Sequence, residues 1–334
     1  MILRLLAPLC GVVIAACGGA STANNPDTAT APYPAGLSDQ TLTVAGVTRQ
    51  YRVHVPAAIA ANPAVAPKGV VVALHGGGGI GPDVATLGAH PLCVFRTVAD
   101  REGFVVVYPI GLPAADGSPG WNDCRGDDRI TSAADDVGFL ATLLDRFRDQ
   151  YRLPAARLFL TGTSNGAMMT HAFAITYPTR VGAVAASAGN LAEQPRSGPC
   201  AAGPLTPVPI MILHGTADTQ MPYEGGCVAN IGGACNRGRV ISAEATRDRW
   251  LAANGLTVVT PTVVTIDSSA ADAGPARRFD YAGPAPMRWW QLEGAGHTVP
   301  SRTVLIAPNA LTGVQNRDVE FAEIAWAFFA SRLP

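Results

Sequence analysis

The sequence contains almost no lysine, and its charges of opposite sign nearly cancel. Lys68 is the single lysine among 334 residues, and the formal net charge at pH 7 is −1. A nucleotide phosphate loop is excluded, because no Lys-Ser or Lys-Thr follows the glycine run at 76–79. A Ser–Lys hydrolase motif is excluded too, since no serine is followed three residues later by lysine. With no long charged run, the chain is not expected to bind nucleic acid.

The usual spacings of metal ligands are also missing. The cysteines and histidines form no C-x-x-C or H-x-x-x-H pattern. A metal site is therefore not expected. The long apolar run at residues 5–16 is too short to span a bilayer comfortably, and it suits the apolar part of a signal peptide instead.

The N-terminal residues predict export. Arg4 precedes the apolar run, which ends in Ile-Ala-Ala-Cys at 14–17 and resembles a bacterial lipobox. We therefore expect a signal peptide at 1–16 and a lipid anchor on Cys17; ordinary cleavage near the same place is the alternative. Residues 17–37 are small, polar and proline-containing, as in a flexible linker. Gly18 follows the cysteine, and by resemblance to other bacterial lipoproteins this favours the outer membrane.

An exported protein meets an oxidising compartment, in which cysteines form disulfides. Apart from Cys10 and Cys17, the chain has five cysteines. They are Cys93, Cys124, Cys200, Cys227 and Cys235. A bond between Cys227 and Cys235 would close a short loop, and one between Cys93 and Cys124 would join two loops. The sequence does not choose among the pairings. A monomer is expected.

The rest of the chain, 38–334, predicts one α/β domain. Residues 40–55 alternate apolar and polar around Ala45-Gly46, which predicts an antiparallel hairpin. Continuous apolar runs, typical of strands buried on both faces, occur at 69–74, 104–109, 157–162, 181–187 and 208–215. Helical patterns occur at 135–151, 164–177, 241–253 and 318–333. The alternation predicts an α/β doubly wound fold, a mostly parallel twisted sheet with helices on both faces.

Polar residues follow four of the predicted strands. His75 opens a glycine run, Ser164 lies inside the G-x-S-x-G of 162–166, and Asp218 and His297 follow later strands. The order Ser, Asp, His is that of an α/β-hydrolase triad, in which the serine sits on a sharp strand-to-helix turn. Asp218 is favoured as the acid because it follows a buried strand directly, and its alternative is a turn cap. Other candidates for the acid are Asp267, Asp272 and Asp280.

These residue types in this order support acyl transfer. A serine hydroxyl becomes nucleophilic when a histidine accepts its proton, and an acid orients that histidine. Backbone N–H groups must receive the oxyanion, and Asn165, Gly77 and Gly78 are the candidate donors. His75, Trp121 and Tyr223 are candidates for substrate binding. His75 could instead order its loop, and burial of Trp121 in the core is an equal alternative to stacking on substrate.

Several longer motifs carry a family resemblance. They are HGGGG, REGFVVVYP, WND at 121–123, DDVGFL, RLFLTGTSNGAMM, HGTAD with MPYEGG, and GAGHTVP. Together they resemble the polyhydroxybutyrate depolymerase/feruloyl esterase family of exported α/β-hydrolases, over residues 40–332. The resemblance implies that Ser164, Asp218 and His297 form the triad of a serine esterase without cofactor. Ile110, Ala167 and Val299 depart from the family pattern near strand ends, where pocket shape is set.

The leading functional hypothesis is an extracytoplasmic serine carboxylic-ester hydrolase of the polyhydroxybutyrate depolymerase kind. The alternative is a feruloyl esterase acting on hydroxycinnamate esters of plant cell walls. Two further hypotheses belong to other classes, a serine peptidase and a non-catalytic binding lipoprotein.

Overall fold

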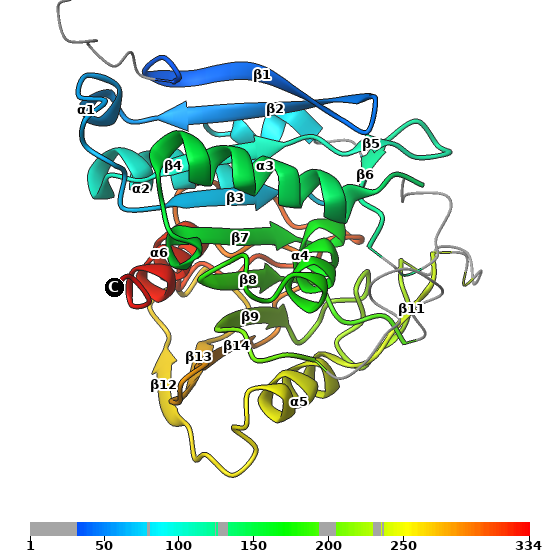
Figure 1. The fold of residues 1–334 in the computed structure, drawn as a ribbon. Coiled ribbons are helices and arrows are strands. Elements are labelled where there is room, and N and C mark those ends of the chain that lie inside the picture. Colours follow the sequence, from blue (N-terminus) through cyan, green and yellow to red (C-terminus); the bar gives the residue numbers. More distant parts are fainter. Residues whose placement is uncertain are drawn as a thin grey trace, which may run out of the picture. The chain divides into compact units, whose positions relative to one another are not determined.

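The strands that the apolar runs predict form the centre of one large sheet (Figure 1). The computed structural model describes residues 32–78, 81–123, 125, 133–193, 205–229, 235 and 237–334. The strand order in the sheet is β1-β2-β4-β3-β7-β8-β9-β14-β13-β12. Pairing is parallel from β4 to β14 and antiparallel at both ends of the sheet. The α/β-hydrolase fold with its N-terminal hairpin is therefore as predicted.

The five strands expected from continuous apolar runs have bounds close to those predicted. In the large sheet they are β1 (Gly36–Val44), β2 (Val47–Val55), β3 (Val70–Leu74), β4 (Val105–Pro109), β7 (Leu158–Thr163), β8 (Ala183–Ser187), β9 (Ile210–Gly215), β12 (Thr262–Ile266), β13 (Ala276–Tyr281) and β14 (Met287–Leu292). Two short antiparallel pairs lie outside it, β5 (Leu112–Pro113) with β6 (Pro119–Gly120) and β10 (Gly226–Cys227) with β11 (Arg239–Val240).

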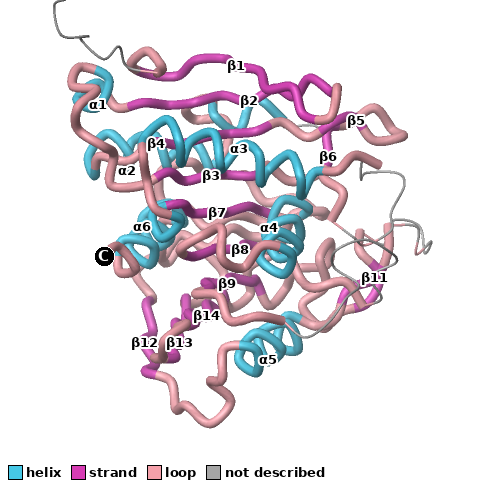
Figure 2. Tube along the Cα trace, in the orientation of Figure 1, coloured by secondary structure: helices cyan, strands magenta, loops and turns pink. Residues whose placement is uncertain are grey.

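Helices cover both faces of the sheet (Figures 1 and 2). The helices are α1 (Ala57–Ala60), α2 (Val94–Glu102), α3 (Asp136–Tyr151), α4 (Asn165–Thr176), α5 (Ala243–Ala253) and α6 (Phe321–Ala330), with 3₁₀ turns at Gly81–Ala85, Pro91–Cys93 and Ala155–Arg157. Apolar side chains of α3, α4 and α5 pack on one face, and those of α2 and α6 pack on the other. Because both faces are covered, the central strands β3, β4, β7, β8 and β9 are buried at every position and mostly apolar.

The two tryptophans of β14 illustrate this packing. Trp289 belongs to the apolar cluster under α3, α4 and α5, and Trp290 belongs to the cluster under α2 and α6. Successive side chains of a strand point to opposite faces, so adjacent tryptophans anchor both layers. Each is about 1% exposed.

The folded domain begins earlier than residue 38. Strand β1 starts at Gly36, and Tyr33 before it is buried at 3% exposure. The ring of Tyr33 stacks on Phe147 of α3 with centroids 5.4 Å apart, and its hydroxyl lies 3.1 Å from that of Tyr51. The last residues of the expected linker therefore belong to the core. The expected signal peptide and the expected anchor residue Cys17 lie outside the described residues.

The C-terminal helix begins later than predicted. Residues 318–320 were expected to be helical, but α6 starts at Phe321. The carboxylate of Asp318 accepts hydrogen bonds from the backbone N–H groups of Ser268 and Ser269, and Glu320 accepts from Ser301. Both acids tie neighbouring loops instead of opening the helix. Helix α2 and strands β12 and β13 were not predicted.

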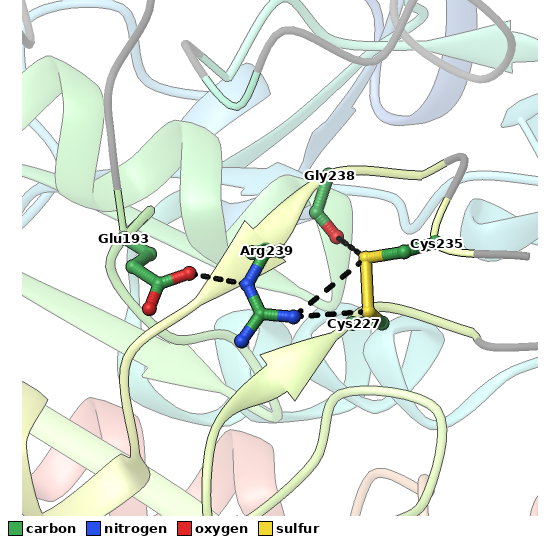
Figure 3. The surroundings of a disulfide bond; sticks show 5 residues. All are labelled: Glu193, Cys227, Cys235, Gly238 and Arg239. Carbon is green, nitrogen blue, oxygen red and sulfur yellow. Dashed lines mark hydrogen bonds and ion pairs between the residues drawn. A yellow bond between two sulfur atoms is a disulfide. The ribbon is translucent and has the colours of Figure 1, made fainter.

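One of the two cysteine pairings considered is present. Cys227 and Cys235 form a disulfide across the β10–β11 region (Figure 3). Cys93 is a buried free thiol, so its pairing with Cys124 is wrong. Cys124 and Cys200 lie outside the described residues. No helix in the described part of the chain is long and apolar enough to cross a membrane.

Candidate active site

Ser164 occupies a strained turn between β7 and α4. Its backbone angles are φ 54° and ψ −122°, a combination that residues other than glycine rarely adopt. The glycines on both sides are required by close packing. A Cβ on Gly162 would collide with the carbonyl of Gly166, and a Cβ on Gly166 would collide with the carbonyls of Leu74 and His75. The G-x-S-x-G pattern therefore reports a crowded elbow that presents the serine at the end of the sheet.

Three strand ends bring Ser164, His297 and Asp218 into one hydrogen-bonded series. Ser164 Oγ lies 2.9 Å from Nε2 of His297, and Nδ1 of His297 lies 2.7 Å from Oδ2 of Asp218. The contacts join residues 133 and 79 positions apart in the sequence. The parallel register places the carboxyl ends of β7, β9 and β14 at the same edge, so the loops that follow them meet there.

The carboxylate of Asp218 is held ionised. Burial by itself would raise the pKa of Asp218, but the charge and hydrogen bond of His297, together with those of His214, outweigh burial and lower it. Oδ1 of Asp218 accepts hydrogen bonds from the backbone N–H groups of Gln220 and Met221, at 2.9 and 2.8 Å. An ionised, fixed carboxylate suits the task of orienting an imidazole.

Asn165 begins helix α4 directly after the serine. The first N–H groups of a helix have no partner inside it, so this N–H is available to a ligand beside Ser164. The side chain is used elsewhere. Its Oδ1 accepts from the N–H of Trp121 at 2.8 Å, and its Nδ2 donates to the Trp121 carbonyl and to Asp123. The side chain thereby fixes the start of the helix.

The glycine loop after β3 lies against the serine. An ideal Cβ on Gly76 would be 3.3 Å from Cβ of Ser164, and Gly77 lines the cavity beside it. Gly78 has φ +93°, is exposed, and is not part of the cavity wall. Of the two glycines predicted as oxyanion donors, the structure places Gly77 and not Gly78 at the site.

His75 orders this loop. Its Nε2 accepts a hydrogen bond from the N–H of Gly111 at 2.9 Å, so the ring proton is on Nδ1, which donates to the carbonyl of Gly76 at 2.6 Å. Burial lowers the pKa of His75 to about 4, although the bond to Gly76 acts in the opposite direction. The ring is fully buried and outside the cavity wall. Direct contact with substrate, as considered for His75, is therefore contradicted, and the loop-ordering alternative fits.

Trp121 and Tyr223 are not placed to touch substrate either. Trp121 is fully buried, and its indole N–H donates to the carbonyl of His75 at 2.9 Å, so the packing alternative holds. The hydroxyl of Tyr223 donates to Glu244 at 3.1 Å and accepts from Gln291 at 2.9 Å. Burial, with the charge of Glu244, raises the pKa of Tyr223 to about 12. Neither side chain is among the lining residues of the cavity.

A cavity of about 280 Å³ opens beside Ser164 and His297. Its wall also contains residues that the sequence did not single out as substrate-binding. They are Gly76, His90, Arg125, Thr163, Gln220, Met221, Val228, Ala229, Arg237, Thr298, Val299, Ile306 and Thr312. Of the three departures from the family pattern, Val299 alone is among the lining residues. Ligand pockets commonly span roughly 300–1,000 Å³, so this one suits a small group.

His90 contributes a neutral polar group to this wall. Its Nδ1 accepts from the N–H of Leu92 at 3.1 Å, which leaves Nε2 to carry the proton. Burial, and the nearby His75, lower the pKa of His90 to about 4. His90, Arg125 and Arg237 lie in loops and outside the family motifs, so the sequence offers little signal for them. Among the described residues, no group of three or more His, Cys, Asp or Glu could hold a metal ion.

The sheet, the strained serine and the hydrogen-bonded series define an α/β-hydrolase. Its residues 56–230 match the family described as Phospholipase/Carboxylesterase, and the chain belongs to this family. The predicted kinship with α/β-hydrolase esterases is thus confirmed. That the chain belongs to the polyhydroxybutyrate depolymerase branch of these esterases stays a prediction.

Curated relatives include two fungal esterases. The chain is 32% identical to feruloyl esterase B of Neurospora crassa over 159 residues, which are 46% of this chain and 48% of the relative. It is 30% identical to acetylxylan esterase A of Emericella nidulans over 139 residues, 42% of this chain and 41% of the relative. The chain thus spans about half the length of the curated relatives it matches or less.

The fold is also that of a solved esterase. An acetyl xylan esterase from Aspergillus awamori superposes with a TM-score of 0.52, covering 79% of this chain and 95% of its own. At 21% identity the likeness concerns the fold alone.

Proposed function

We propose that the chain is a serine carboxylic-ester hydrolase that works through an acyl-enzyme. The observation that carries the proposal is the series Ser164–His297–Asp218, with distances of 2.9 and 2.7 Å. A nucleophile, a base and an orienting acid in hydrogen-bond contact are what this chemistry requires. The Phospholipase/Carboxylesterase family supports the same reaction class.

The reaction would proceed in two half-steps. Nε2 of His297 takes the proton of Ser164 as Oγ attacks the ester carbonyl carbon, and the carbonyl oxygen becomes an oxyanion. The N–H groups of Asn165 and Gly77 are the donors proposed to receive it. His297 then gives the proton to the leaving alcohol, and the C–O bond of the ester breaks. Water then attacks the acyl-enzyme in the same way, with His297 again as base and then as acid, and the carboxylic acid and free Ser164 are released.

The acyl and alcohol groups are open between two substrate classes. Relatives named feruloyl esterase and acetylxylan esterase support esters of plant cell-wall polysaccharides. The motif resemblance supports esters of 3-hydroxyalkanoates instead. A cavity of about 280 Å³ holds a small group rather than a length of polymer, so a short ester or a chain end is the expected substrate in either class.

We place this activity outside the cytoplasm. The proposal rests on the apolar segment at 5–16 and on the lipobox-like residues that end at Cys17. Acyl chains on Cys17 would hold the enzyme at a membrane surface, with the linker as a tether.

The test uses a soluble form that starts after Cys17. Ser164→Ala should abolish hydrolysis of a p-nitrophenyl ester while the circular dichroism spectrum is kept. Ser187→Ala, at the end of the neighbouring strand β8, is the matched control and should retain activity. A serine-directed phosphonate should add its mass to Ser164 alone. Full activity of the Ser164 variant would overturn the proposal.

The other two hypotheses are outcomes of the same experiment. Cleavage of peptide anilides faster than of esters would favour a peptidase. An unlabelled Ser164, together with no hydrolysis of any ester, would favour a binding protein.

A further inference from the structure

Two arginines line the cavity, and no acidic residue is among its described lining residues. Arg125 is buried, with 3% of its surface exposed. Its Nε and Nη2 are buried without a hydrogen-bond partner, although Nη2 lies 3.1 Å from Oδ2 of Asp123. A guanidinium carries five N–H donors, and buried donors normally find acceptors. An arginine with unfilled donors in the wall of a reactive cavity indicates a ligand rich in acceptors.

Arg125 is held close to the nucleophile by a short series of contacts. Oδ2 of Asp123 accepts from Nδ2 of Asn165 at 2.7 Å, and the same oxygen lies 3.1 Å from Nη2 of Arg125. Asn165 directly follows Ser164. A ligand group on Arg125 and an ester carbonyl on Ser164 could therefore belong to one small molecule.

The fold also shapes a place for the aliphatic part of this arginine. A Cβ on Gly238 would collide with Cγ of Arg125 and lie 3.0 Å from its Cδ. Gly238 has φ +73° and lies beside the disulfide of Cys227 and Cys235 (Figure 3). The glycine leaves room that the arginine side chain fills, so the guanidinium is positioned from behind and not free to swing into solvent.

The charge on the wall suits a single negative group. Asp123 lies against Arg125, whereas Arg237 makes no ion pair with any described residue. The charges of these three described side chains sum to +1. A planar guanidinium fork matches the two oxygens of a carboxylate. A dianionic phosphate would bring one charge more than these side chains balance.

We infer that the cavity binds a carboxylate of the substrate through Arg125, with Arg237 supplying the second positive charge. The substrate class is then an ester that carries a free carboxylate near the scissile bond. This inference rests on the proposed esterase function. The carboxylate belongs either to the acyl half, as in a half-ester of a dicarboxylic acid, or to the alcohol half, as at the carboxyl end of a hydroxyalkanoate oligomer.

Two matched substrate pairs separate these sources. Monomethyl succinate and methyl succinamate differ only in an acyl-side carboxylate or carboxamide. 3-Acetoxybutyrate and its primary amide differ in the same way on the alcohol side. The expected result is a kcat/KM about tenfold or more higher for the carboxylate member of one pair, as charge-assisted hydrogen bonds allow. Equal or faster hydrolysis of the amide in both pairs would overturn the inference.

Variants connect that preference to the arginines. Arg125→Gln should reduce the carboxylate-to-amide ratio about fivefold or more, and Arg125→Lys should also reduce it, because lysine lacks the fork. Arg277→Gln is the control, since Arg277 on β13 pairs with Glu293 and is not part of the cavity wall, and it should keep the wild-type ratio. If Arg125→Gln does not fold, the Lys variant and Arg237→Gln decide. A ratio that survives in them contradicts the inference.

Failure of the inference differs from failure of the proposed function. If the inference alone is wrong, the neutral amides are still hydrolysed and Ser164 is still labelled by the phosphonate. If the proposed function is wrong, neither pair is hydrolysed.

Discussion

Nε2 of His214 lies 3.3 Å from Oδ2 of Asp218, the same oxygen that receives Nδ1 of His297. The Nε2–H of His214 also donates to the carbonyl of Met221 at 2.8 Å. His214 is fully buried at the end of β9, so it cannot act on substrate itself. It supports the acid from behind and fixes the turn that carries it.

His214 is therefore expected to be a positioning residue. His214→Phe keeps an aromatic ring but removes the N–H, so the Asp218 loop loses its anchor. We expect kcat to fall about tenfold, because the activation free energy rises by about the net free energy of one hydrogen bond. KM should change little. His214→Gln can donate again and should recover part of the loss. His54→Gln, in the hairpin, is the control. A rise in KM with constant kcat would contradict this role.

Stability should fall as the pH is lowered from about 7 to about 4. Burial lowers the pKa of His75, His90 and His171 from 6.5 to about 4. Between those values the unfolded chain binds protons that the folded chain does not, so acid favours unfolding. Each histidine contributes up to about 3 kcal/mol across this window. The effect is complete near pH 4 and absent above the unfolded pKa.

Urea unfolding at pH 7.5, 6 and 5 measures this dependence. His171→Gln removes one of the three groups and should make the slope of unfolding free energy against pH shallower. His171 accepts from the Trp250 indole and donates to the Gly189 carbonyl, so the variant is also expected to be less stable at neutral pH. An unchanged free energy between pH 7.5 and 5 would refute the assignment.

Trp121→Phe should weaken hydrolysis of all esters alike. The indole N–H supports the carbonyl of His75 behind the Gly76–Gly77 loop, and the side chain is fully buried. Losing this bond should lower kcat for acetate and ferulate esters by the same factor, about tenfold or less. The two substrates are compared side by side. Stacking on substrate would instead raise KM for the ferulate ester alone, and that result would restore the discarded alternative.

The sequence predicted the features that depend on local sterics. The crowding around Gly162 and Gly166 allows nothing but glycine, so the elbow leaves a readable pattern. The meeting of Ser164, Asp218 and His297 could also be predicted, because each follows a strand of the parallel sheet and the carboxyl ends of parallel strands lie at one edge. The antiparallel strands β12, which is largely exposed, and β13, which is mostly half-buried, carry no such apolar run and were missed.

Contacts between distant loops could not be predicted. Which face Trp121 presents depends on its bonds to His75 and Asn165, 46 and 44 positions away. The place of Arg125 in the cavity likewise depends on Gly238, far along the chain. The WND motif contains Trp121 but does not report which way its side chain turns, and Arg125 lies in no motif.

The disulfide is expected to support substrate binding more than the chemical step. Cys227 and Cys235 are separated by 8 positions, and Val228, Ala229 and Arg237 beside them line the cavity. The double variant Cys227→Ser, Cys235→Ser should lose about 2–3 kcal/mol of stability at most, since the closed loop is short. KM should rise several-fold while kcat changes little, because Ser164, Asp218 and His297 lie on other loops. Steady-state kinetics and urea unfolding measure both effects.

The control is Cys93→Ala, at a buried free thiol in the apolar cluster under α2 and α6. This variant should cost stability but leave KM unchanged. A collapse of kcat with KM preserved would show that the disulfide acts on the reacting groups instead.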